Sequence, residues 1–127
     1  MITLTREDIV ELHSHICMDF ELAEPTRHVK KLLTKVCITQ KINKSDLIFE
    51  EICANFLVSM LINLPFEKYN FDTALLCLES LLHKNNYEIP VQNNQLKYLC
   101  KATEVEPNTM VETLTEYFRY NALPIIS

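Results

Sequence analysis

The 127-residue chain contains no glycine, although about nine glycines are typical of a globular protein of this length. Glycine is the residue that most readily adopts positive φ and that lets a backbone approach a ligand closely. Glycine-rich loops that bind phosphate are therefore excluded. Tight turns must use asparagine instead, and Asn85-Asn86 and Asn93-Asn94 are the candidate pairs.

The cysteines lack the spacing of a metal site or a disulfide framework. They are odd in number and contain no C-x-x-C pair: Cys17, Cys37, Cys53, Cys77 and Cys100. Four of them lie in apolar helical patterns, so we expect buried, reduced thiols, as in a cytoplasmic protein.

Long hydrophobic runs are also absent. The longest apolar stretch, around Phe56–Ile62, is far too short to span a bilayer. The residues before Thr3 lack the basic and apolar regions of a signal peptide. With 48% hydrophobic and 23% charged residues, we expect a soluble cytoplasmic protein with no membrane partner.

Charge is unevenly distributed. The net charge of −5 argues against nucleic acid as the main partner. No acid lies between Glu24 and Asp46, and half of all basic residues lie there: Arg27, Lys30, Lys31, Lys35, Lys41 and Lys44. The first 24 residues are instead acidic. The basic segment is either a solvated helical face or a surface for an acidic protein, carried by Arg27, Lys30, Lys31 and Lys35.

Apolar residues recur at helical spacing over most of the chain. Thr5 and Asp8 resemble a capping box at the start of a helix whose inner face is Ile9, Leu12 and Ile16. Ile2–Leu4, before it, could form a short strand. A second helix is predicted from Pro25-Thr26, with an inner face formed by Val29, Leu32, Leu33 and Val36.

The third predicted helix, capped by Ser45 or Asp46, is the most apolar and belongs at the centre of a bundle. Its main stripe is Ile48, Ile52, Phe56 and Met60. Pro65 ends it, and a fourth helix begins near Phe71–Thr73. An extended segment around Tyr87–Val91 and helices at Gln92–Thr103 and Pro107–Tyr120 follow. We therefore predict an all-α single domain over 1–127, a bundle of about six helices with at most one or two very short strands.

Between the third and fourth helices lies the stretch INLPFEKYNFDT, residues 62–73. This helix–loop–helix resembles the core of the Fic/Doc family, whose loop reads H-P-F-x-[DE]-G-N-[GK]-R. The resemblance is strongest over 46–89 and rests on Pro65, Phe66, Asn70 and Thr73-Ala74. The start LTREDIVELHSHI is also similar to the Doc-type N-terminus.

The resemblance implies that the working residues of the family are missing. The family's general base corresponds to Leu64, its magnesium-binding acid to Lys68 and its anion-hole glycine to Tyr69. Its phosphate-binding arginine corresponds to Asp72, which replaces attraction by repulsion. Loss of a general base alone typically costs about 10²–10⁴ in rate. Glu67 is one position from the acid, and Pro65 and Phe66 remain for structural reasons.

We therefore expect a catalytically inactive Fic/Doc-like protein without a cofactor, acting as an interaction or regulatory module in a toxin–antitoxin or phage–host setting. One alternative is a divergent transferase that moves AMP or phosphate and uses Glu67 and Asn70. Another is a helical adaptor unrelated to the family, whose basic second helix binds an acidic protein.

Other candidate sites are weaker. His13 and His15 point about 200° apart on a helix, so they cannot share a metal ion, and we expect surface or half-buried histidines and no metal. Cys53 and Cys77 lie on apolar faces, so we expect them to be inert thiols in the core. The apolar C-terminal tail either packs on its own domain or pairs with a partner or a second copy: Tyr117, Phe118, Tyr120, Leu123, Ile125 and Ile126.

Overall fold

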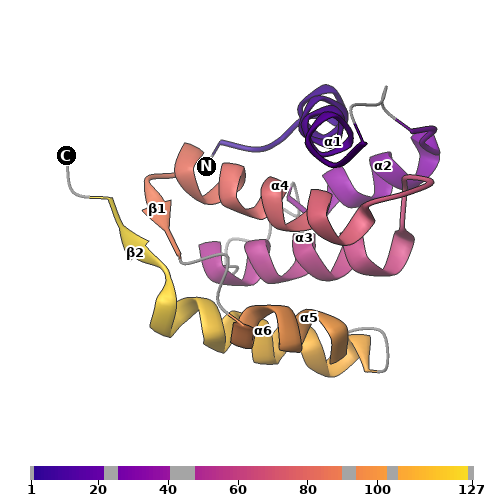
Figure 1. The fold of residues 1–127 in the computed structure, drawn as a ribbon. Helices are drawn as coiled ribbons and strands as arrows, with labels where there is room; N and C mark the ends of the chain where they lie inside the picture. Colours follow the sequence, from indigo (N-terminus) through magenta and orange to yellow (C-terminus); the bar gives the residue numbers. More distant parts are fainter. Residues whose placement is uncertain (1, 22–25, 41–47, 90–93, 103–105, 126–127) are drawn as a thin grey trace.

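The computed structural model describes residues 2–21, 26–40, 48–89, 94–102 and 106–125. Within these ranges the chain is a small all-α helical bundle with one two-stranded sheet, as predicted (Figure 1). The elements are α1 (Arg6–Glu21), α2 (Lys30–Ile38), α3 (Phe49–Asn63), α4 (Asn70–Lys84), β1 (Tyr87–Glu88), α5 (Asn94–Ala102), α6 (Pro107–Asn121) and β2 (Leu123–Pro124).

Helix α3 is the centre of the bundle. It packs against α2, α4 and α6, and Figure 1 shows it between α4 and the α5–α6 pair. Its buried residues cover most of its circumference: Cys53, Ala54, Phe56, Leu57, Val58, Met60 and Leu61. A helix that is apolar on most sides needs neighbours on most sides, so its central position follows from its composition.

A single cluster of buried side chains connects all six helices. Phe56 of α3 and Phe118 of α6 are among its largest members, and each is at most 1% exposed. Burying such a side chain stabilises a fold by roughly 1.5–3 kcal/mol. The contacts of α3 therefore hold α2 and α4 on one side of the bundle to α6 on the other.

Helix α1 begins with the predicted capping box. The Thr5 hydroxyl accepts the Asp8 N–H at 3.1 Å, and the Asp8 carboxylate accepts the Thr5 N–H at 2.8 Å. Two backbone donors that the helix cannot satisfy are thus satisfied reciprocally.

The strand expected at Ile2–Leu4 is not formed; this prediction was wrong. The backbone there bonds to side-chain amides instead of to a second strand. Asn85 bonds to both the N–H and the C=O of Ile2, each at 2.8 Å. Gln40 does the same for Leu4, at 2.7 and 2.9 Å. The amides replace the pairing that a strand would have supplied.

Two predicted helix starts also need correction. Helix α2 begins at Lys30, not at Pro25-Thr26, because the backbone of residues 27–29 pairs with the α3–α4 loop. Val29 is consequently its N-cap and is 52% exposed rather than facing inward. Helix α3 begins at Phe49 with Ile48, 37% exposed, as N-cap. Ser45 and Asp46, the predicted caps, lie outside the described residues.

The C-terminal tail packs partly on its own domain. Tyr117 and Phe118 are buried, and β2 pairs antiparallel with β1. Because the Ile125 N–H donates to the Asn86 carbonyl, Pro124 faces the outer edge of β2, where it offers no N–H to a further strand. Tyr120 and Leu123 remain 80% and 59% exposed.

No helix in the described part of the chain has the length and apolar character that crossing a bilayer requires.

Replacing Thr5 by alanine should lower the free energy of unfolding by about 1 kcal/mol, because the Asp8 N–H loses its acceptor. Urea denaturation followed by circular dichroism measures the change. Thr113→Ala is the matched control, since the Thr113 hydroxyl only donates back to a carbonyl of its own helix. That control should be neutral or slightly stabilising. Equal losses in both variants would contradict the capping role.

Candidate functional site at the loop between α3 and α4

The loop from Leu64 to Tyr69 joins the ends of α3 and α4. Leu64 ends α3 in the left-handed region, at φ 45° and ψ 62°, and its N–H donates to the Met60 carbonyl. A proline disfavours the right-handed helical conformation in the residue before it, so Pro65 stops the helix, as predicted.

The loop contains a second left-handed residue, Tyr69, at φ 63° and ψ 30°. This conformation costs a residue with a Cβ about 1–2 kcal/mol relative to the right-handed one. The surrounding structure must hold both residues in place, because the chain has no glycine to adopt the conformation freely.

The side chain of Asn70 closes the loop on itself. Its Oδ1 accepts the N–H of Phe66 at 2.9 Å, and its Nδ2 donates to the carbonyl of the same residue at 2.7 Å. Both ends of the amide are therefore engaged inside the loop. Phe66 is only 4% exposed and belongs to the core, which confirms its structural role.

Residues 27–29 form a short antiparallel pairing with the loop. The Val29 N–H donates to the Pro65 carbonyl at 2.9 Å, and the Glu67 N–H donates to the Arg27 carbonyl at 3.0 Å. His28 and Phe66 form the bridge between these two bonds. This pairing explains why α2 begins three residues after Arg27.

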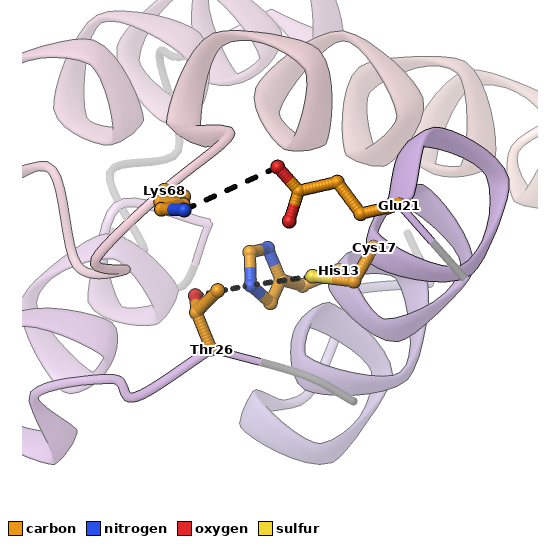
Figure 2. A network of polar contacts seen from close by, with 5 residues as sticks. All are labelled: His13, Cys17, Glu21, Thr26 and Lys68. Atoms are coloured by element: carbon orange, nitrogen blue, oxygen red, sulfur yellow. Dashed lines mark hydrogen bonds and ion pairs between the residues drawn. The ribbon is translucent and has the colours of Figure 1, made fainter. Parts of the chain in front are cut away.

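His13 of α1 lies beneath the loop and connects four segments. Its Nδ1 is 2.9 Å from the Thr73 hydroxyl of α4, and its Nε2 is 2.7 Å from the Thr26 hydroxyl. The Cys17 sulfur lies 3.3 Å from the same Nε2. Figure 2 shows the imidazole between Cys17 and Thr26. The ring also stacks on Phe66, with centroids 3.8 Å apart.

The His13 ring is completely buried, contrary to the expectation of a surface or half-buried histidine. Burial, with His28 nearby as a second cause, lowers the pKa of His13 below its usual value. A neutral imidazole has one donor and one acceptor nitrogen. Hydroxyl groups can serve either nitrogen, so the two threonines satisfy the neutral ring in either tautomer.

Glu21, at the end of α1, contacts the loop from above (Figure 2). Its carboxylate lies 4.0 Å from the Lys68 ammonium. A hydrogen bond to Glu21 is the main cause that raises the pKa of Tyr69 to about 12. The Tyr69 ring also meets Phe20 edge to face, with centroids 5.3 Å apart. Glu21 and Phe20 thus both contact the side chain of Tyr69, whose backbone is in the left-handed region.

The remaining predicted residues are on the surface or at the start of α4. Glu67 is exposed, and Asp72 is half-buried in the first turn of α4. The basic residues Arg27, Lys30, Lys31 and Lys35 are all exposed, on α2 and the segment before it. The structure therefore gathers the loop residues but leaves the basic residues as a separate surface.

The thiols offer no nucleophile. All five cysteines are free and buried, as predicted. Burial raises the pKa of Cys53 and of Cys77 and raises that of Cys100 to about 12, so these stay thiols at neutral pH. Cys17, beside His13, is 0% exposed. Among the described residues, no three His, Cys, Asp or Glu side chains are placed to hold a metal ion.

The sequence contained a signal for His13 that the apolar pattern alone did not reveal. Ile9, His13 and Cys17 are the buried residues of α1, and each is four positions after the last. Continuing the series leads to Glu21, which contacts the loop. Residues spaced by four lie on one helix face, so His13 belongs to the inner face.

Comparison with protein-family models finds no match, and neither the curated proteins nor the solved structures include one with significant similarity to this chain.

Because the pKa of His13 is lowered in the folded state, the unfolded chain binds this proton more readily. Stability should therefore fall as pH drops below about 6.5, by up to about 1.4 kcal/mol per pH unit, until the folded-state pKa is reached. Urea denaturation at a series of pH values measures the slope. His13→Gln should remove this component, whereas His15→Gln, at an exposed position on α1, should keep it. An unchanged slope in His13→Gln would contradict the assignment.

The phenol of Tyr69 should titrate near pH 12 rather than near its usual 10. Ultraviolet difference titration against Tyr69→Phe isolates this tyrosine. Glu21→Gln should bring the pKa back toward 10, because the carboxylate that accepts the hydrogen bond is lost. Asp19→Asn is the control, an exposed acid of the same helix that should leave the titration unchanged. Equal shifts in both variants would indicate a general charge effect.

Proposed function

We propose that this chain is a catalytically silent, Fic/Doc-like protein that acts through interactions with another protein. A cytoplasmic location, expected from the buried reduced thiols, is part of this proposal, and the toxin–antitoxin or phage–host setting comes from the family resemblance. A shared fold supports function only weakly, so the support for this function comes from the loop itself.

The observation that carries the proposal is that several polar groups of the loop already bond to other groups of the same chain. The N–H groups of Phe66 and Glu67 donate to Asn70 and Arg27, so they are not free to bind a phosphate. Lys68, the cation of the loop, lies beside Glu21. Asp72 places a carboxylate in the first turn of α4, where a helix otherwise favours a bound anion.

The backbone at Tyr69 supports the family resemblance. This residue corresponds to the family's glycine, and its φ of 63° is one that glycine adopts most easily. A positive φ at the position that corresponds to the family's glycine is compatible with a loop of the family's kind, and the Tyr69 side chain meets Phe20 and Glu21.

A divergent transferase that relies on Glu67 and Asn70 is less well supported. Both ends of the Asn70 amide bond to Phe66, so the side chain would have to release its own loop before holding a nucleotide. The exposed basic surface, by contrast, is compatible both with a Fic/Doc-like module and with an unrelated helical adaptor.

Isothermal titration with Mg²⁺-ATP and other nucleotides tests the proposal. The native protein should show no binding up to millimolar nucleotide. A variant combining Leu64→His, Lys68→Asp, Tyr69→Gly and Asp72→Arg should gain measurable binding, because it restores the family's base, acid, glycine and arginine in a loop of the same shape. Circular dichroism verifies that the variant is folded.

Micromolar binding by the native protein would contradict the proposal that the loop is catalytically silent, and would make Glu67 and Asn70 the first residues to mutate. A folded restored variant that still binds no nucleotide would remove the support for the family resemblance and favour the unrelated adaptor.

A further inference from the structure

A groove runs along the surface between α1 and α2, and among its lining residues His28 also pairs with the α3–α4 loop. A hollow of about 520 Å³ is lined by Arg6, Glu7, Val10, Glu11, Ser14, His28, Lys30 and Leu33. A second hollow of about 400 Å³ continues along α2 as far as Ile38. Arg6 and Glu7 line both hollows. The first hollow follows α1 from Arg6 to Ser14, about 12 Å at 1.5 Å per residue.

The two walls of the groove carry opposite charge. Glu7 and Glu11, one helical turn apart on α1, form the acidic wall, and both are exposed. Lys30 is the charged residue of the opposite wall, and His28 lies beside it as a polar lining residue. The Arg6 guanidinium, although it comes from α1, reaches across to the Thr34 hydroxyl of α2 at 3.4 Å and adds to the basic side.

Among the described residues, no ion pair joins the two walls. Within the described residues the ion pair is Lys68–Glu21, which lies at the loop and involves neither wall. Between the walls, Val10 and Leu33 provide an apolar floor, and Ile38, 54% exposed, lies at the far end. A groove with two unpaired walls of opposite sign favours a ligand that is itself charged on both edges.

We infer that this groove binds an amphipathic helix of a partner protein, about two turns long, with basic side chains along one edge and acidic side chains along the other. The four-residue spacing of Glu7 and Glu11 matches Lys or Arg at the same spacing on such a helix. Its apolar stripe would lie on Val10 and Leu33, as in other helix-in-groove complexes. The inference deepens the interaction role proposed above and rests on it.

Three stapled helical peptides of equal length and with the same Ala/Leu stripe test this inference. One has lysines on one edge and glutamates on the other; the second has lysines on both edges, and the third has glutamates on both. A helix can enter the groove in either direction, so the mixed peptide always finds a matching orientation, whereas each single-sign peptide repels one wall.

Fluorescence anisotropy with the full chain at low salt should give a dissociation constant for the mixed peptide about tenfold or more below those of the other two. The variant Glu7→Lys with Glu11→Lys makes both walls basic, so it should prefer the peptide with glutamates on both edges. This exchange of preference cannot result from simple unfolding.

Glu112→Lys with Glu116→Lys is the matched control. It changes the same residue type at the same spacing and shifts the net charge equally, but on α6, at a different hollow. The control should keep the native preference for the mixed peptide. An equal change of preference in the control would overturn the groove as the site.

Native binding that is tightest for the peptide with glutamates on both edges would also overturn the groove, and would assign binding to the basic surface alone. Because nucleotide titration is independent of these peptides, a failure of the groove leaves the silent-loop proposal standing, and the reverse also holds.

Discussion

The arrangement of the loop depends on one buried, neutral histidine. His13 is 0% exposed, and its ring is in contact with Thr26, Thr73 and Phe66, which belong to three different segments. The stack on Phe66 requires a flat ring and the two threonine contacts require a polar atom on either side of it. An aliphatic side chain would take this partner from the buried Thr73 hydroxyl and from the half-buried Thr26 hydroxyl. A charged ring would be desolvated, with His28 adding repulsion. The position of the loop over α1 therefore follows from the chemistry of this ring.

The same kind of side-chain hydrogen bonding holds the backbone at three separate places. Asn70, Asn85 and Gln40 each use the donor and the acceptor of one amide to hold the N–H and C=O of a single distant or neighbouring residue: Phe66, Ile2 and Leu4. An amide side chain offers a backbone the same pair of bonds as a neighbouring strand does. In this chain, such clamps hold the backbone before α1 and the loop that contains the left-handed residues Leu64 and Tyr69. The loop at Asn70 is thus held by the same kind of amide clamp as the segment before α1.

Features of the fold that depend on neighbouring residues could be predicted from the sequence, whereas features that depend on distant residues could not. Helical spacing predicted the bundle and the central place of α3, and Pro65 and the Thr5–Asp8 box predicted helix ends, because each depends on neighbouring residues. The start of α2 depends on pairing with Pro65 and Glu67, about 40 residues away, and no local pattern encodes that. The spacing of Ile9, His13 and Cys17 places His13 on the inner face of α1, but only the tertiary fold brings its partners Thr26 and Thr73 to it. The basic residues were expected to be on the surface, but the acidic wall opposite them appears only when α1 and α2 pack.

The loop and the groove differ in how their polar groups are used, and this difference bears on function. In the loop, the amide of Asn70 and the N–H of Glu67 are hydrogen-bonded within the chain, and the Lys68 ammonium lies 4.0 Å from the Glu21 carboxylate. In the groove, Glu7, Glu11 and Lys30 stay exposed beside an apolar floor. His28 belongs to both, since it lines the groove and its ring lies 6.1 Å from that of Phe66. A partner seated in the groove would therefore touch the segment that pairs with the loop.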